Sequence, residues 1–309
     1  MNGVLLMAYG AAASLDDIPA FLRDILGGRA PSDELVAEVR ERYRLMGGKS
    51  PLVDITRRQA QALAAELNGG GTEPVRVYIG MRHSAPTILE AVESLKADGV
   101  ERVIALPMTP YLSALSVGAY MTKLQEAMKE GDARAEVIKV DSWHDQPFLI
   151  EAFSRKLREA LDRFSPAERE EVEVLFSAHS LPERILKDKD PYPGQLLATA
   201  AMVAQACGLR RYRFAFQSKG RTSEPWLGPD VAEELDLLRA TGVRSVLVAP
   251  IGFISDHMET LYDDDILYRG QAERLGLRFE RAAALNDDPL LVRALAAVVR
   301  GRLAAAARA

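Results

Sequence analysis

The chain has 309 residues, which is enough for about two domains of ordinary size. Its hydrophobic fraction of 48% and charged fraction of 27% exclude a disordered chain and a collagen-like repeat. The net charge of −5 argues against a nucleic-acid-binding protein, which would need a basic face, so no nucleic-acid partner is expected.

The sequence contains a single cysteine, Cys207. One thiol forms no internal disulfide bond, and it does not supply the four ligands of an iron–sulfur cluster. Residues 1–7 contain an apolar run but lack the basic start of a secretion signal, and no run approaches the roughly 18 apolar residues of a membrane span. We therefore expect a cytoplasmic protein whose contact with membranes is at most peripheral.

Short apolar runs alternate with amphipathic stretches, a pattern typical of parallel sheets covered by helices. Asp16, Ser32 and Thr87 are expected caps at or near helix starts. The predicted helices cover residues 16–26, 33–46, 53–68, 86–98, 115–130, 147–162, 194–208, 230–241, 257–275 and 287–305. The predicted strands cover residues 3–8, 75–79, 103–106, 136–140, 173–177, 213–217, 245–250 and 278–281.

Four of these strands precede residue 145 and four follow it. We therefore expect an α/β fold of two Rossmann-like domains, each a four-stranded parallel sheet flanked by helices. The expected domains are 1–144 and 145–286, with a C-terminal helix at about 287–309 that packs back on the first. Because ligands in such folds bind at the carboxyl ends of strands, functional residues should follow the strands.

In the first half, Tyr9 ends a strand beside Gly10, but no glycine-rich phosphate-binding motif is present. Tyr9 either meets a ligand or is a half-buried structural tyrosine. Ser50 opens a helix after a Gly-Gly pair, where it either caps the helix or binds an anionic group. His83 follows another strand and is a further candidate for the same site.

In the second half, a strand leads directly into Ser177-Ala178-His179-Ser180-Leu181-Pro182. The imidazole of His179 can exchange a proton near neutral pH, unless His179 is an ordinary core histidine. After a later strand, Glu259 and Asp263 are spaced to share one helix face, where they suit a divalent metal or form a solvated acidic helix start. His144 is interpreted as structural, and the long loop 216–230 as a lid or a binding wall.

Several motifs together are similar to those of the ferrochelatases, and the resemblance covers nearly the whole chain. The residues that carry it are Met7-Ala8-Tyr9-Gly10, Arg42-Tyr43, Gly47-Gly48 with Ser50-Pro51, the segment 177–182, Gln217-Ser218, Pro225-Trp226-Leu227-Gly228-Pro229, and Asp256-His257 with Glu259 and Leu261-Tyr262.

The resemblance implies a lyase that inserts Fe²⁺ into a porphyrin held between two Rossmann-like domains. His179 is then the proton acceptor at the metal and Glu259 assists it, with Asp263 and His83 as weaker metal ligands. Tyr9 faces the iron as an axial group in the product. The porphyrin-binding residues implied are Tyr9, Arg42, Tyr43, Ser50, Tyr120, Arg29 and Trp226.

The sequence departs from the family pattern at two positions: Leu26 stands where an arginine is expected, and Leu267 where a glutamate is expected. The turn 7–10 is similar to that of enzymes that use coproporphyrin III, so coproporphyrin III and Fe²⁺ are the expected substrates. No further cofactor is expected, and a coproheme decarboxylase would use the product. The alternatives are a protoporphyrin IX ferrochelatase, a cobalt or nickel chelatase for another tetrapyrrole, and a non-catalytic tetrapyrrole carrier.

Overall fold

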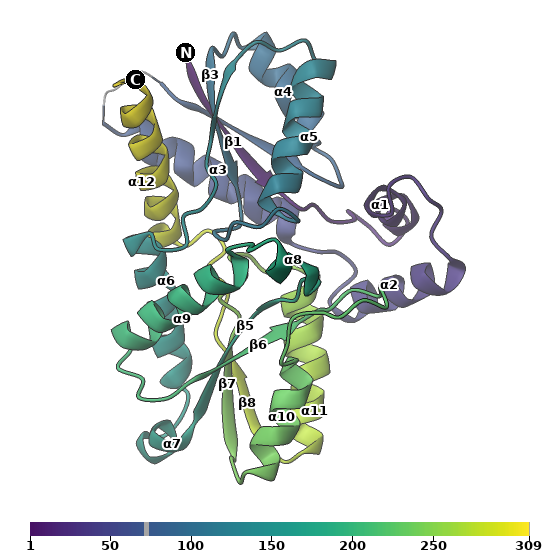
Figure 1. The fold of residues 1–309 in the computed structure, drawn as a ribbon, viewed down its shortest axis with the longest axis vertical. Coiled ribbons are helices and arrows are strands. Elements are labelled where there is room, and N and C mark those ends of the chain that lie inside the picture. Colours follow the sequence, from purple (N-terminus) through teal and green to yellow (C-terminus); the bar gives the residue numbers. More distant parts are fainter. Residues whose placement is uncertain (71–73, 309) are drawn as a thin grey trace. The chain divides into compact units, whose positions relative to one another are not determined.

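The computed structural model describes residues 1–70 and 74–308, and the chain divides into two compact units (Figure 1). The first unit comprises Met1–Trp143 and Asn286–Ala309, and the second comprises His144–Leu285. Each unit is built around its own parallel sheet.

The sheet of the first unit has the order β2-β1-β3-β4, with every pair parallel. Its strands are β1 (Asn2–Ala8), β2 (Arg76–Met81), β3 (Arg102–Pro107) and β4 (Glu136–Lys139). The helices are α1 (Ile18–Ile25), α2 (Asp33–Leu45), α3 (Leu52–Asn68), α4 (Ile88–Ala97), α5 (Val117–Glu130) and α12 (Pro289–Ala306).

The strand β1 is central in this sheet. All its residues from Gly3 to Ala8 are buried, whichever face they point to, because helices cover both faces of the sheet. One face packs into a core with α4 and α5, to which Leu5, Val92 and Leu124 contribute. The C-terminal helix α12 packs against α3, so the end of the chain completes the unit in which the chain begins (Figure 1).

The sheet of the second unit has the order β6-β5-β7-β8, again with every pair parallel. Its strands are β5 (Glu173–His179), β6 (Arg213–Gln217), β7 (Ser245–Ala249) and β8 (Arg278–Arg281). Its helices are α6 (Pro147–Leu161), α7 (Pro166–Glu171), α8 (Arg184–Lys187), α9 (Tyr192–Ala206), α10 (Val231–Ala240), the π-helix η1 (Glu259–Tyr268) and α11 (Arg269–Arg274).

The predicted fold class is confirmed: both sheets have four parallel strands and are flanked by helices. The fifth strand continues past the predicted residue 177, so that His179 is its last residue. The short helices α7 and α8 were not predicted, because four to six residues do not establish a helical period. Ser32 and Thr87 cap their helices as expected, whereas Asp17 and not Asp16 occupies the N-cap of α1.

The predicted helix 257–275 is two elements in the structure, η1 followed by α11. A π-helix has a wider turn than an α-helix and is often found at functional sites. Among residues 1–70 and 74–308, none of the helices combines the length and apolarity that crossing a bilayer requires.

Candidate functional site

His179 lies at the carboxyl end of the central strand β5 of the second unit, and its side chain is 33% exposed. Its Nε2 lies 3.4 Å from Oε1 of Glu259, the first residue of η1. Its Nδ1 contacts the carbonyl oxygen of Ser180. A carbonyl and a carboxylate both accept hydrogen bonds, so this environment favours an imidazole that carries a proton on each nitrogen.

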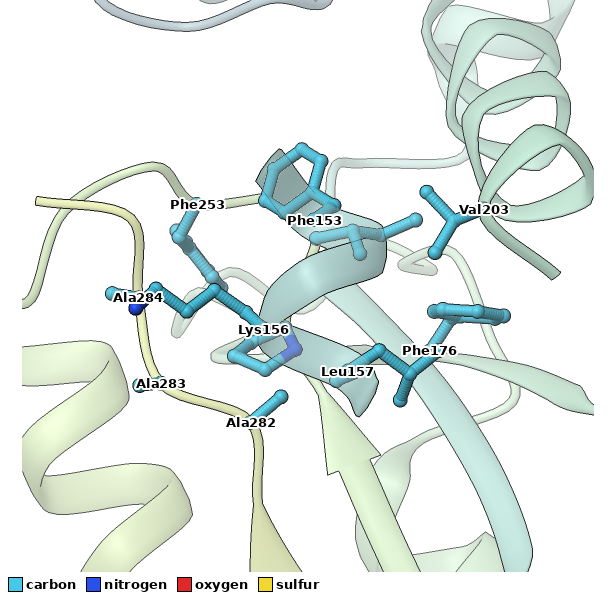
Figure 2. A pocket seen from close by; sticks show the side chains of 12 residues that line it. Phe153, Lys156, Leu157, Phe176, Val203, Phe253, Ala282, Ala283 and Ala284 are labelled. Atoms are coloured by element: carbon cyan, nitrogen blue, oxygen red, sulfur yellow. The ribbon is translucent and has the colours of Figure 1, made fainter. Parts of the chain in front are cut away.

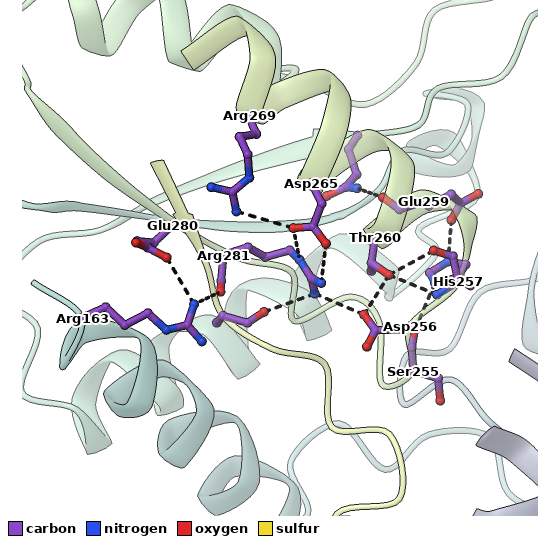
Figure 3. A network of polar contacts seen from close by, with 12 residues as sticks. Arg163, Ser255, Asp256, His257, Glu259, Thr260, Asp265, Arg269, Glu280 and Arg281 are labelled. Carbon is purple, nitrogen blue, oxygen red and sulfur yellow. Dashed lines mark hydrogen bonds and ion pairs between the residues drawn. The ribbon is translucent and has the colours of Figure 1, made fainter. Parts of the chain in front are cut away.

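The carboxylate of Glu259 lies between two imidazoles, because His257 also contacts it (Figure 3). Nε2 of His257 lies 3.0 Å from Oε2 of Glu259, and Nδ1 of His257 lies 3.0 Å from the carbonyl oxygen of Ser255. Both carboxylate oxygens of Glu259 therefore face a histidine nitrogen.

These contacts shift the pKa values of His179 and Glu259 in opposite directions. Burial opposes a charge on His179, but the Glu259 carboxylate outweighs burial and raises the pKa of the imidazole above its ordinary value. Burial would raise the pKa of Glu259, but the charge and hydrogen bond of His179, aided by His257, outweigh it and lower that pKa. The raised pKa of His179 and the lowered pKa of Glu259 both favour the ion-paired state of the two side chains.

The end of β6 holds η1 at two residues. Nε2 of Gln217 donates a hydrogen bond to the backbone oxygen of Glu259 at 3.1 Å. Oγ of Ser218 donates one to Oδ2 of Asp263 at 2.5 Å. Asp263 is almost fully buried, and its charge adds to the rise in the pKa of His179.

Further along η1, the side chain of Asp264 is fully buried, and neither of its carboxyl oxygens has a hydrogen bond of ordinary geometry among the described residues. The nearby amide of Gln217 still acts to lower its pKa. The neighbouring Arg281 forms ion pairs with two other carboxylates (Figure 3). Its Nη2 lies 2.7 Å from Oδ2 of Asp265 and its Nη1 lies 3.2 Å from Oδ1 of Asp256. Burial therefore raises the pKa of Asp264 well above its ordinary value, and the charge of Arg281 offsets only part of that rise.

The loop after β7 supports His257 through an aromatic contact, since the rings of Phe253 and His257 lie 4.8 Å apart between centroids. Phe253 also lines a small cavity with Phe153, Lys156 and Phe176 (Figure 2). Its volume of about 10 Å³ accommodates a single water molecule at most, so this cavity is a packing feature and not a substrate pocket.

In the first unit the structure brings Tyr9 and His83 together. The two rings lie 4.6 Å apart between centroids, and the side chain of Tyr9 follows β1 and is 42% exposed. Nδ1 of His83 lies 2.6 Å from Oδ2 of Asp24. Burial of His83 outweighs the effect of Asp24 and lowers the pKa of the imidazole. A cavity of about 920 Å³ in this unit is lined in part by His83 and Ser50.

The other residues predicted to bind porphyrin in the first unit have structural contacts. The hydroxyl of Tyr43 accepts a hydrogen bond from the Ala12 backbone at 3.2 Å, and its ring is buried. Arg42 forms an ion pair with Glu38 at 2.7 Å. Tyr120 belongs to the core between the sheet and its helices.

Two remaining candidates in that unit lie at chain turns. Oγ of Ser50 accepts a weak hydrogen bond from the backbone of Leu52 at 3.4 Å, which agrees with the helix-start interpretation. Nε of Arg29 donates to the carbonyl oxygen of Leu26 at 3.2 Å, so the side chain of Arg29 folds over the end of α1.

Trp226 lies in the loop that follows β6 in the second unit. Its Nε1 donates a hydrogen bond to Oγ1 of Thr222 at 3.1 Å. The ring covers Gly220 so closely that a Cβ at Gly220 would lie 2.5 Å from two ring carbons. An ion pair of 2.6 Å between Arg184 and Glu224 ties the loop to α8. These contacts hold the loop together and attach it to α8.

Sequence reasoning missed two residues of this site, His257 and Gln217, although both lie in motifs that carry the resemblance. His144 has structural contacts, as interpreted from the sequence: its carbonyl oxygen accepts a hydrogen bond from Thr199 at 2.9 Å, and burial lowers its pKa. Across the part of the chain that the structure describes, no three His, Cys, Asp or Glu side chains are arranged to hold a metal ion.

Comparisons with known proteins show which sequences and structures this chain resembles. The family model described as Ferrochelatase matches residues 1–303. A ferrochelatase from Herpetosiphon aurantiacus is 41% identical over 301 residues, which cover 97% of this chain and 99% of that protein. A coproporphyrin III ferrochelatase from Geobacillus thermodenitrificans is 40% identical over 304 residues, which cover 98% of this chain and 96% of that protein.

Two solved structures have a fold similar to that of this chain. The sirohydrochlorin chelatase SirB from Bacillus subtilis subspecies spizizenii in complex with cobalt has a TM-score of 0.57 at 10% identity, covering 97% of this chain and 94% of that one. SirB from Bacillus subtilis with Fe³⁺ has a TM-score of 0.60 at 12% identity, covering 97% and 95%.

Replacing Asp264 by Asn should stabilise the protein, and the gain should grow as the pH rises. Between the ordinary pKa near 3.8 and the raised pKa, the unfolded chain releases the Asp264 proton while the folded protein retains it, so the wild type loses stability with rising pH. An amide does not ionise and avoids this loss.

The measurement is urea unfolding of both proteins from pH 4 to pH 8, with the exposed Asp188→Asn as the control. A stability difference that is independent of pH would contradict the buried, proton-retaining state of Asp264.

Proposed function

The chain belongs to the ferrochelatase family of lyases, which insert iron into a porphyrin, and we propose from this premise that its substrate is coproporphyrin III. The observation that supports metal insertion at this site is the contact of His179 with Glu259 at the carboxyl end of β5. The product would be Fe-coproporphyrin III.

Support for coproporphyrin III comes from the relatives and from one turn. The relative from Geobacillus thermodenitrificans is a coproporphyrin III ferrochelatase by name. The segment Met7-Ala8-Tyr9-Gly10 resembles the corresponding turn of such enzymes. The proposed setting is the cytoplasm, and a coproheme decarboxylase would be the next enzyme.

Iron insertion exchanges one Fe²⁺ for the two N–H protons of the porphyrin, so the enzyme must attract a cation and remove protons. Glu259 is ionised at neutral pH because the neighbouring imidazoles lower its pKa, so it is suited to attract Fe²⁺. A cation at this carboxylate weakens its hold on the His179 proton. We propose that His179, whose side chain is 33% exposed, then releases that proton to water and accepts one from a pyrrole nitrogen. A second release and acceptance would remove the other pyrrole proton, so that two protons leave for the one Fe²⁺ that enters.

The other predicted site residues keep supporting roles in the proposal. Asp263, held by Ser218, would be a weaker metal ligand near the pair. Tyr9 would be the axial group of the iron in the product, and His83, whose ring contacts that of Tyr9, a weaker ligand. Arg42, Tyr43, Ser50, Tyr120, Arg29 and Trp226 would line the porphyrin; no cofactor beyond the substrate Fe²⁺ is proposed.

Two alternatives are supported by specific observations. The relative from Herpetosiphon aurantiacus is named a ferrochelatase without a stated porphyrin, which leaves protoporphyrin IX as the alternative substrate. The fold likeness to SirB keeps a cobalt or nickel chelatase in view, although at 10% identity it concerns the fold alone.

We expect the purified protein to metallate coproporphyrin III faster than protoporphyrin IX. The test is anaerobic Fe²⁺ insertion followed by absorbance, with both porphyrins side by side. Faster turnover of protoporphyrin IX would contradict the interpretation of the Tyr9 turn. Turnover of neither porphyrin, with turnover of a sirohydrochlorin-type ring and Co²⁺, would favour the chelatase alternative.

His179→Ala should lower the rate of Fe²⁺ insertion by about 100-fold or more, because general-base catalysis contributes on that order. Porphyrin binding, measured by fluorescence quenching, should change little. His144→Ala removes a structural histidine of the same unit and is the matched control. Near-normal turnover by His179→Ala would exclude this residue as the proton acceptor.

Glu259→Gln should lower kcat by roughly 10-fold to 100-fold, since the amide neither attracts Fe²⁺ nor pairs with protonated His179. Its KM for the porphyrin should stay close to that of the wild type. Glu280→Gln, which removes an ion-paired carboxylate elsewhere in the second unit, is the control. A change confined to porphyrin affinity would contradict the role proposed for Glu259.

A further inference from the structure

We propose that Gln217 is a positioning residue that fixes the geometry of the His179–Glu259 pair. The inference rests on the proposed function, in which these two groups receive the metal and the protons. It assigns a task to a residue that touches neither the iron nor the porphyrin in the proposal.

Gln217 reaches the His179 side of the pair through its backbone. It is the last residue of β6 and pairs in register with His179, the last residue of β5. Its carbonyl oxygen accepts a hydrogen bond from the backbone N–H of Ser180 at 2.8 Å. The backbone next to His179 is thereby hydrogen-bonded to the end of β6, at the point where both strands end.

The side chain of Gln217 reaches the Glu259 side. Its Nε2 donates a hydrogen bond of 3.1 Å to the backbone oxygen of Glu259. Since Glu259 is the first residue of η1, this bond holds the start of the π-helix against the end of the sheet. One residue thus contacts the backbones that carry both members of the pair.

The hydrogen bonds of the buried Gln217 amide indicate the role of this side chain. Gln217 is fully buried, and its Oε1 has no hydrogen-bond partner among the described residues. A buried amide with one orphaned oxygen is unfavourable for stability by about 1–3 kcal/mol. An apolar side chain would avoid that cost, but it would lose the bond to the Glu259 backbone and the hydrogen bonding by which the amide of Gln217 lowers the pKa of Asp264.

The neighbouring residue supports the same interface. Ser218 has a left-handed backbone with φ of 58°, which redirects the chain directly after β6. In that conformation its hydroxyl donates to Asp263, four residues after Glu259. Two consecutive residues at the end of β6 therefore attach η1 at two places on its acidic face.

A neutral amide suits the task. A charged group in this position would compete with His179 for the carboxylate of Glu259 or repel it. Catalytic groups need positions that are accurate to well under 1 Å, and residues that orient them typically affect activity by about 10-fold to 100-fold.

The first test is Gln217→Met, which keeps the volume of the side chain but removes the donor. The matched control is Gln59→Met: Gln59 is also fully buried, and its Nε2 donates to a backbone oxygen, that of Asn286, at 2.7 Å in the first unit. Anaerobic Fe²⁺ insertion into coproporphyrin III gives kcat and KM, and thermal unfolding reports folding.

We expect Gln217→Met to lower kcat by about 10-fold to 100-fold with a KM for the porphyrin within about 2-fold of the wild type. Gln59→Met should leave both close to the wild type. An unchanged kcat in folded Gln217→Met, or an equal loss in the control, would overturn the proposal. If Gln217→Met does not fold, Gln217→Asn, which keeps an amide too short to reach Glu259, is measured against the same expectation.

A double variant separates a positioning role from a general packing effect. In the Glu259→Gln background, adding Gln217→Met should lower kcat by less than about 2-fold further, because both changes act through the carboxylate of Glu259. Fully additive losses would overturn the inference. Failure of the wild type to insert Fe²⁺ into coproporphyrin III would refute the proposed function itself. Inactive His179→Ala and Glu259→Gln variants beside a fully active Gln217→Met would refute the inference alone.

Discussion

The contact of the Glu259 carboxylate with two imidazoles is the constraint on which the rest of the second unit's site depends. A carboxylate withdrawn from water is tolerated when a cationic partner and hydrogen bonds replace its hydration. His179 and His257 supply those partners, one on each carboxylate oxygen. The chain must therefore bring the end of β5, the loop after β7 and the start of η1 to a single position.

The acidic residues of η1 show how the fold tolerates several buried carboxylates near one another. Asp265 and Asp256 share Arg281, and Asp263 accepts a hydrogen bond from Ser218. Asp264 has no such partner, and its raised pKa favours the neutral acid. Each carboxyl group near the pair is thus ion-paired, hydrogen-bonded or shifted toward protonation.

The two units share one strand order but carry different chemistry at the ends of their central strands. In the first unit, β1 leads to an exposed tyrosine whose ring contacts His83. In the second, β5 ends in a histidine that is paired with a carboxylate. The same topology therefore presents an aromatic group in one half and a proton-exchanging group in the other, and the side chains at the strand ends make the difference.

The sequence by itself determined the sheets, because uninterrupted apolar runs such as 246–249 are typical of strands covered on both faces. It also predicted His179 and Glu259 as site residues, because they follow strands and lie in distinctive motifs, and the structure brings their side chains to 3.4 Å. Only the tertiary structure decided their partners: Gln217 and Glu259 are 42 residues apart, and no local period relates them. The π-helix, the burial of Tyr120 and the unpartnered state of Asp264 likewise depend on packing between segments distant in the chain, which local sequence patterns do not encode.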